Sequence, residues 1–334
     1  MGHKHIAQLG ATYHEFNRNH PTIASDVRGV IEEQLADAGV SYDRVVARVK
    51  TWRSLRAKAL KRDETGAFVY ADPWHDIKDI LGVRITTFYS ADIPVVLDLL
   101  SKSFAVKKSV DKAAETRISG GFGYGSHHLI LQVRPNDDDL KDYVGLVFEV
   151  QVRTVLQHAW AEFEHDIRYK GADQQDPRVD RAFTLAAGLI ELADQQFDQI
   201  AQILGETPSK SDEVELSAET LPGVLAMLIG NRFPMSRSEY YAWLEEILAV
   251  NGITTVAELR KLLDDHTIAD VEKALNYQFV PGQVRLIDDL LLCQFREDHI
   301  ARTKDSGHRA KFRAQRLKKR LETMRSAGIV AENR

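Results

Sequence analysis

Hydrophobic and polar residues alternate from Phe148 to Arg153, a pattern that predicts a β-strand with one apolar and one polar face. The apolar face carries Phe148, Val150 and Val152, and the polar face carries Glu149, Gln151 and Arg153. On the helix predicted to follow, His158, Glu162 and His165 are spaced at i, i+4 and i+7 and share one stripe. A carboxylate, an amide, a guanidinium and imidazoles at the end of a strand are the groups that a phosphate-handling site needs.

Helical spacing of apolar residues dominates the rest of the chain. It predicts helices before Val40, one long amphipathic helix from Val179 to Leu204, and further helices at Arg237–Val250, Val256–Asp265 and Val284–Gln294. The expected organisation is a helical extension at residues 1–40, a core with a trailing helix at 41–205, and a helical domain with a basic tail at 214–334. The expected fold class is α+β, a mixed sheet flanked by helices, plus an all-α C-terminal domain.

Composition narrows the class of protein. The chain has 334 residues, of which 44% are hydrophobic and 28% charged, as in an ordinary globular protein. No stretch approaches the ~20 apolar residues of a membrane span, so we expect a cytoplasmic protein without membrane contact. The single Cys293 excludes an internal disulfide framework and a cysteine-based zinc site. The net charge of −5 gives no general attraction to nucleic acid, so any such contact is local.

The segment from Arg44 to Arg62 is rich in Lys and Arg and contains no acidic residue. Its composition favours a helix, on which Ser54, Lys58 and Lys61 share one face, with Arg48 and Lys50 leading into it. A solvated basic helix is one interpretation. The other is a rigid platform that holds a triphosphate through charge-assisted hydrogen bonds.

The segment from Ile77 to Tyr89 is typical of a short helix, a glycine turn at Gly82 and a β-branched strand. Asp79 stands just before this strand. An aspartate at such a place is either a turn or cap residue or an oxygen ligand for Mg²⁺, which binds one or two carboxylates together with substrate phosphates. The second reading requires another carboxylate, and Glu149 is the candidate.

A glycine-rich loop, residues 120–125, leads into a further predicted strand. Its glycines allow close approach of a ligand, and Tyr124 offers a flat face on which a purine can stack. The alternative is a hairpin turn with a packing tyrosine. The spacing fits neither a Walker A loop nor a dinucleotide fingerprint.

Taken in order, these segments resemble the synthetase domain of the RelA/SpoT family, the enzymes that make the alarmones (p)ppGpp. The resemblance runs from about Tyr42 to Gly171 and rests on four ordered motifs. They are Arg48-Val49-Lys50 with Ser54 and Lys58; Asp79 to Ile85; Gly123 to His128, which matches a Tyr-x-Ser-x-His loop; and Glu149 to Thr154 with Trp160, Ala161, Glu164, His165, Tyr169 and Lys170.

The resemblance implies a nucleotidyltransferase-like core that transfers pyrophosphate from ATP to the 3′-hydroxyl of GDP or GTP, with Mg²⁺ as cofactor. It assigns ATP binding to Arg48, Lys50, Ser54, Lys58 and Lys61, and guanine-nucleotide binding to Tyr124, Ser126, His128, Gln151, Arg153 and His158. It assigns catalysis and metal binding to Asp79 and Glu149, with Glu149 accepting the hydroxyl proton. No His-Asp hydrolase domain is expected. The long helix after the core suggests a homo-oligomer.

The tail from Arg302 to Arg325 carries ten Lys or Arg residues against Asp305 and Glu322. It is either a solvated helix end or a patch that contacts tRNA or other RNA. The second interpretation matters because some toxic small members of the family pyrophosphorylate the tRNA 3′ end. A non-catalytic nucleotide sensor is a third hypothesis, which the intact pair of Asp79 and Glu149 disfavours.

Overall fold

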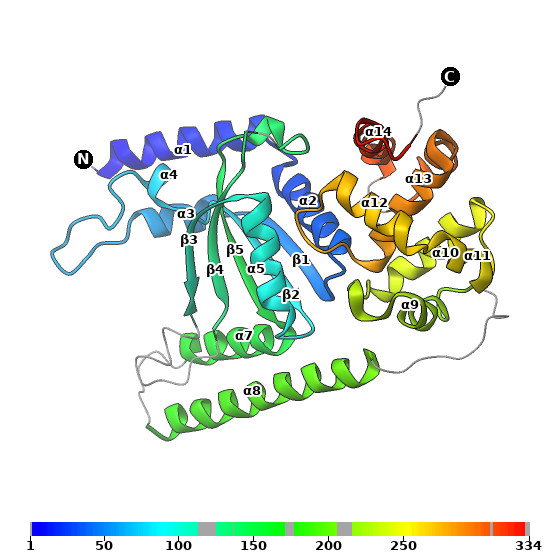
Figure 1. Cartoon of the computed structure of the whole chain (residues 1–334). Coiled ribbons are helices and arrows are strands. Elements are labelled where there is room, and N and C mark those ends of the chain that lie inside the picture. Colours follow the sequence, from blue (N-terminus) through cyan, green and yellow to red (C-terminus); the bar gives the residue numbers. More distant parts are fainter. Residues whose placement is uncertain are drawn as a thin grey trace. The chain divides into compact units, whose positions relative to one another are not determined.

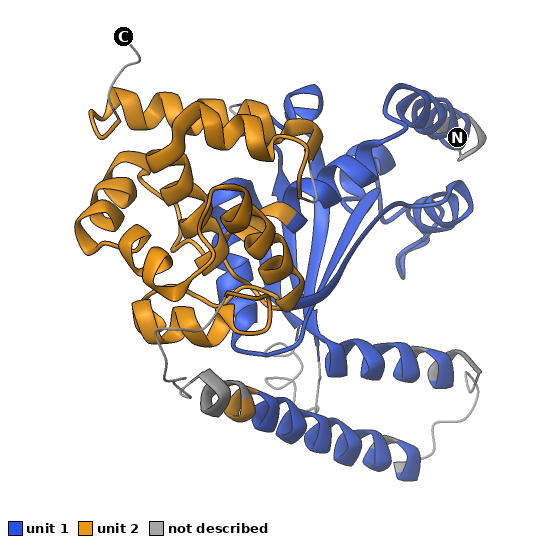
Figure 2. Ribbon diagram, turned by 90° about the vertical axis from the view of Figure 1, so that its right-hand side faces the viewer, with its two compact units in different colours: residues 1–32, 42–197 blue, residues 33–41, 198–334 orange. Residues whose placement is uncertain are grey.

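The computed structural model describes residues 2–112, 125–135, 137–170, 177–205, 216–307 and 310–330. The chain forms two compact units (Figure 2). Unit 1 comprises residues 1–32 and 42–197, and unit 2 comprises residues 33–41 and 198–334. None of the helices in the described part of the chain combines the length and the apolar composition that crossing a membrane requires.

Unit 1 is built on a five-stranded sheet (Figure 1). Its strands are β1 (Tyr42–Val49), β2 (Leu81–Thr87), β3 (Ala105–Asp111), β4 (His127–Gln132) and β5 (Val147–Thr154). They lie in the order β1-β2-β5-β4-β3. The pairing of β2 with β5 is parallel and the other pairings are antiparallel, so the predicted mixed sheet is confirmed.

The alternation along β5 separates a buried face of the sheet from a polar one. Phe148, Val150 and Val152 are all 0% exposed, because β5 is the central strand and its apolar side chains lie in the core of the unit. Helix α5 (Asp92–Ser103) packs against β5 and β3 and contributes fully buried Val96 and Leu100. The polar face carries the side chains that the sequence singled out.

Several more helices surround the sheet within unit 1. They are α1 (Gly2–Asn19), α2 (Ile23–Asp37, whose last residues belong to unit 2), α3 (Trp52–Ala59), α4 (Pro73–Asp76), the 3₁₀ turn η1 (Lys141–Tyr143), α7 (Val155–Lys170) and α8 (Pro177–Gly205, which enters unit 2 after Phe197). Leu9 of α1 packs with Leu55 and Ala59 of α3 and with Ile77 and Ile80. This small cluster fixes α3 beside the segment that carries Asp79.

The basic segment from Arg44 to Arg62 is not one helix, which corrects the expectation from its composition. Residues 42–49 form β1, because Val45, Val46 and Val49 favour extended backbone and Val45 packs into the core. Helix α3 ends at Ala59, and Asp63 then accepts hydrogen bonds from the backbone of Thr65 and Ala67 in a tight turn. Lys61 therefore lies beyond the helix, so the predicted face shared with Ser54 and Lys58 does not form.

The glycine turn expected at Gly82 does not form, because Gly82 lies inside β2. It pairs with Arg48 on one side and Glu149 on the other. A Cβ added at Gly82 would meet nothing within 4 Å, so the polar face is open above this position. The long helix and the strand that runs directly into a helix were predicted correctly, as α8 and as β5 followed by α7.

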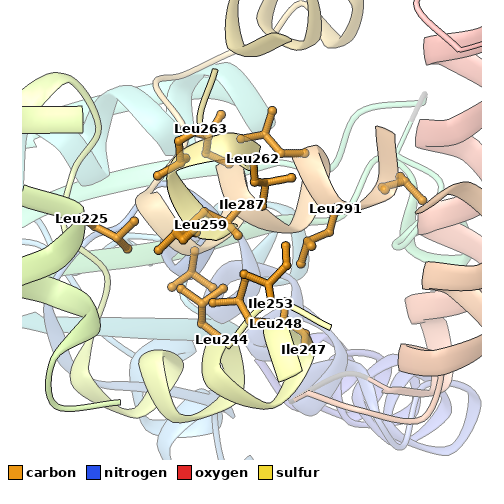
Figure 3. Packing of buried hydrophobic residues seen from close by; sticks show 14 of the residues in the cluster. Leu225, Leu244, Ile247, Leu248, Ile253, Leu259, Leu262, Leu263, Ile287 and Leu291 are labelled. Carbon is orange, nitrogen blue, oxygen red and sulfur yellow. The ribbon is translucent and has the colours of Figure 1, made fainter. Parts of the chain in front are cut away.

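The secondary-structure elements of unit 2 are helices in its described residues, as predicted. Its elements are α9 (Leu221–Ile229), the 3₁₀ turn η2 (Gly230–Arg232), α10 (Ser238–Val250), α11 (Val256–Leu262), α12 (Asp265–Leu275), α13 (Gln283–Thr303) and α14 (Ala310–Ser326). Leucine and isoleucine side chains from α10, α11 and α13 interdigitate in its core (Figure 3). Thr255 begins α11 with a capping box to Glu258.

The basic tail folds into α14 and uses much of its charge inside unit 2. Four of its arginines have acidic partners: Arg313 with Asp288, Arg316 with Glu33, Arg320 with Asp288, Asp289 and Asp37, and Arg325 with Glu297. Asp288 is 2% exposed and Asp289 is 0% exposed, so the ion pairs of Arg313 and Arg320 with these two residues are interior. The cations that α14 leaves on the surface are mainly lysines, among them exposed Lys311 and Lys318.

Candidate functional site

The polar face of the sheet gathers charged residues from several strands. In the parallel pairing of β2 with β5, Gly82 lies beside Glu149 and Arg84 beside Gln151. On the other side of β5, His128 of β4 lies beside Gln151. Residues paired across a sheet point to the same face. The pairing therefore brings Arg84, His128, Glu149 and Gln151 together.

Asp79 is held by two lysines at one end of this face. Lys50 Nζ lies 2.7 Å from Asp79 Oδ2, and Lys58 Nζ lies 2.9 Å from Asp79 Oδ1. Lys50 follows β1, and its amide donates a 2.7 Å hydrogen bond to the carbonyl of Ile80. Burial raises the pKa of Asp79, but the hydrogen bonds and charges of Lys50 and Lys58 outweigh it, so the net shift is downward. Asp79 is therefore ionised at neutral pH.

Glu149 lies between His128 and Gln151. Its Oε1 is 2.9 Å from His128 Nδ1, and its Oε2 accepts a 3.3 Å hydrogen bond from Gln151 Nε2. Burial and the negative charge of Asp79 raise the pKa of Glu149, but the hydrogen bonds from His128 and Gln151 and the charge of His128 outweigh them, so the pKa is lowered. The side chain is 19% exposed, which leaves it accessible from the open side of the sheet.

Asp79 and Glu149 together suit a divalent cation. Asp79 acts on the pKa of Glu149 as a neighbouring negative charge, and a cation between them would relieve that repulsion. The described residues contain no group of three or more His, Cys, Asp or Glu that could hold a metal ion. The donor set is thus two carboxylates, which is the protein contribution typical of Mg²⁺ bound jointly with substrate phosphates.

A second polar cluster lies where β2 and β5 meet α7. Glu162 Oε1 is 3.2 Å from Arg84 Nη1 and 3.3 Å from Arg153 Nη2. Arg153 Nη2 also lies 2.7 Å from His158 Nδ1, and its side chain is only 5% exposed. Burial, Arg153 and Arg84 lower the pKa of His158 although Glu162 raises it, so neutral imidazole is favoured. Arg84 was not among the predicted site residues, although the alternation of Gly82, Arg84 and Thr86 places it on the polar face.

The other predicted residues are distributed as follows. Arg48 is in β1 beside Gly82, on the same face as Glu149. Ser54 is exposed in the first turn of α3, where its amide donates to Thr51. Lys61 is exposed beyond that helix. Tyr124 lies outside the described residues.

In a comparison with known protein families, a match lies in the part of the chain that carries these residues. The family described as "Region found in RelA / SpoT proteins" matches residues 47–174. GTP pyrophosphokinase YjbM of Bacillus subtilis (strain 168) is 29% identical over 167 residues, which are 48% of this chain and 72% of YjbM. GTP pyrophosphokinase YwaC of the same organism is 31% identical over 127 residues, which are 37% of this chain and 57% of YwaC.

Among solved structures, small alarmone synthetase 1 from Bacillus subtilis is similar over 59% of this chain and 99% of its own, at 22% identity and a TM-score of 0.47. The family match covers the whole polar face described above, from Arg48 through Asp79, His128 and Glu149 to Glu162. Residues 47–174 therefore match the region that RelA and SpoT proteins share.

Proposed function

We propose that the chain is a GTP/GDP pyrophosphokinase that transfers pyrophosphate from ATP to the 3′-hydroxyl of GDP or GTP. The observation that carries the proposal is the pair of neighbouring carboxylates, Asp79 and Glu149, on an open sheet face with Lys50 and Lys58 beside them. The relatives YjbM and YwaC, which bear the name GTP pyrophosphokinase, support the same activity.

In this proposal the donor nucleotide lies at the Asp79 end of the face. Lys50 and Lys58 neutralise the phosphates of ATP, and Arg48, in the neighbouring strand, adds a further cation. Asp79 and Glu149 would hold Mg²⁺, which supplies charge neutralisation to the reacting phosphates when it is bound. Phosphoryl transfer depends mainly on positioning and on stabilising charge, so a fixed lysine pair serves the reaction directly.

The acceptor lies against Glu149. The 3′-oxygen forms a bond to the β-phosphorus of ATP, the bond from that phosphorus to the oxygen bridging to the α-phosphorus breaks, and AMP leaves. Glu149 accepts the proton of the 3′-hydroxyl on one of its two carboxylate oxygens. Gln151 orients the carboxylate through Oε2. His158 and Arg153, at the α7 end, and Ser126, just before β4, complete the guanine-nucleotide side of the proposal, together with Tyr124, which lies outside the described residues.

A transfer assay tests the proposal. Purified protein is incubated with Mg²⁺ and ATP labelled in the γ-phosphate, and GDP, GTP and deacylated tRNA are offered in parallel. We expect label in (p)ppGpp, and loss of the label in Asp79→Asn and Glu149→Gln. Label in tRNA alone would replace the proposed acceptor by the tRNA 3′ end, and nucleotide binding without any transfer would support the sensor hypothesis.

The ion pairs of α14 are relevant to the tRNA alternative. Arg313, Arg316, Arg320 and Arg325 pair with acidic residues of unit 2, so RNA contact by these four would require breaking ion pairs. Exposed Lys311 and Lys318 are the residues to replace if tRNA is labelled. The free guanine nucleotide is therefore the acceptor that we favour.

A further inference from the structure

Three side chains form a hydrogen-bonded line that ends at Glu149. Ser126 Oγ lies 2.8 Å from His128 Nε2, and His128 Nδ1 lies 2.9 Å from Glu149 Oε1. Ser126 is itself tied to the sheet, because its carbonyl accepts a 3.3 Å hydrogen bond from the amide of Lys112. The line therefore connects the strand edge before β4 with the centre of β5.

The protonation of this line follows from its partners. Ionised Glu149 can only accept a hydrogen bond, so the proton between it and His128 must lie on Nδ1. Nε2, the other ring nitrogen of His128, lies 2.8 Å from the hydroxyl of Ser126, which can donate or accept a hydrogen bond. Ser126 thus fixes the orientation of the ring in which Nδ1 points to Glu149.

We infer that His128 is a positioning residue for Glu149, and that Ser126 maintains it in that role. This inference rests on the proposed function and deepens it: the Ser-x-His pair serves the carboxylate that receives the hydroxyl proton, and not the guanine nucleotide alone. His128 fixes Oε1 and Gln151 fixes Oε2, while the carboxylate side chain stays 19% exposed.

The surroundings of Glu149 explain why such support is needed. Burial and the charge of Asp79 both favour the protonated carboxyl, which would be unable to accept a proton. The largest effect opposing them is the hydrogen bond from His128. Without it, Oε1 would lose the contact that fixes its orientation.

The test compares His128→Ala, His128→Asn and Ser126→Ala with the unchanged protein, measuring kcat and KM for the acceptor across pH. Asparagine is the conservative variant, because its Nδ2 can donate to Glu149 from nearly the position of Nδ1. We expect His128→Ala to lower kcat about 10- to 100-fold, as loss of a supporting partner typically does. Its acid limb should move to higher pH, His128→Asn should restore most of both, and Ser126→Ala should shift the limb partly.

His127→Asn is the matched control, because His127 is next in β4 but bonds Ser109 through Nε2. It should leave the acid limb in place. A rise in KM with an unchanged kcat and acid limb in His128→Ala would overturn the inference, because His128 would then contact only the nucleotide.

A readout independent of activity separates this inference from the proposed function. The titration of the Glu149 carboxyl, followed by ¹³C NMR with Glu149→Gln for assignment, should move upward in His128→Ala and stay low in His128→Asn. An inactive wild-type protein with this shift contradicts the proposed function alone. An active wild-type protein without the shift contradicts the role of His128 alone.

Discussion

Lys58 Nζ donates a 2.9 Å hydrogen bond to Asp79 Oδ1, and this contact fastens helix α3 to the segment that enters β2. Both side chains are half-buried, at 30% and 19% exposed. Lys50 binds the other oxygen of the same carboxylate. One acidic residue thus keeps two cations of the proposed donor site in place before any nucleotide is bound.

Asp79→Asn should lower the free energy of unfolding at pH 7 by about 1–3 kcal/mol, the typical contribution of hydrogen bonds to a charged group. The pKa of Asp79 is lowered on folding, so its ionised form stabilises the fold at pH values above its ordinary pKa of 3.8. That contribution is lost as pH falls through the folded pKa. Urea unfolding of both proteins should therefore show a difference at pH 7 that narrows below pH 3.8.

Asp98→Asn is the control for this experiment, because Asp98 pairs with Lys102 on the surface of α5 and is 57% exposed. Exposed pairs of this kind contribute little. A loss of stability in Asp98→Asn as large as that in Asp79→Asn would show that the effect does not come from the lysine pair.

Glu162→Gln should lower the pKa of His158 further below its ordinary value of 6.5. Burial and the charges of Arg153 and Arg84 already depress it, and Glu162 is the neighbour that opposes them. Histidine titrations followed by NMR should show this downward shift, while His127 keeps its midpoint. The pKa of His127 depends mainly on burial, Asp111 and His128. An unchanged or higher His158 midpoint would contradict the proximity of Glu162 to His158, whose Nδ1 lies 3.6 Å from Glu162 Oε1.

Thr154→Val should loosen α8 from the end of β5. Thr154 Oγ1 donates a 2.9 Å hydrogen bond to Asp194 Oδ2, and the two residues are 0% and 3% exposed. Valine has nearly the same shape but leaves Asp194 without this donor, which should cost about 1–3 kcal/mol. Limited proteolysis should then cut α8 faster. Thr154→Ser keeps the hydroxyl and should retain wild-type protection; equal cleavage of both variants would count against the contact.

The elements predicted correctly are those in which the spacing of apolar residues along the sequence matches the side that is buried in the fold. The alternation of Glu149, Gln151 and Arg153 gave the strand and its polar face correctly, because β5 is central and one of its faces is apolar. The basic segment from Arg44 to Arg62 has a composition that favours a helix, but its valines place residues 42–49 in β1. Arg84 was not among the predicted site residues, although it alternates with buried Val83 and Ile85 and so belongs to the polar face of β2.

The contact of His128 with Glu149 could not be predicted from the sequence, because it depends on the register between two strands. The register of β4 against β5 places His128 beside Gln151, two residues from Glu149, and no local pattern specifies which residues of two distant strands become neighbours. The same holds for α14, whose cations look free in the sequence. Their partners Asp288 and Asp289 come from another helix, and Glu33 and Asp37 from a segment far away in the chain.

Arg313→Met should destabilise the protein strongly, while Lys318→Met should not. Arg313 donates two hydrogen bonds to Asp288, at 3.1 and 2.6 Å, and Asp288 is 2% exposed. Removing one partner of a buried pair typically costs about 3–5 kcal/mol, because the remaining charge loses its compensation. Lys318 lies on the exposed side of α14. Lys318→Met therefore removes the same charge from the same helix without breaking a buried pair. Thermal unfolding of the two variants, together with their affinity for tRNA in filter binding, therefore separates the two roles of the tail. A stable Arg313→Met protein that has lost tRNA affinity would show that this arginine serves RNA instead of the fold of unit 2.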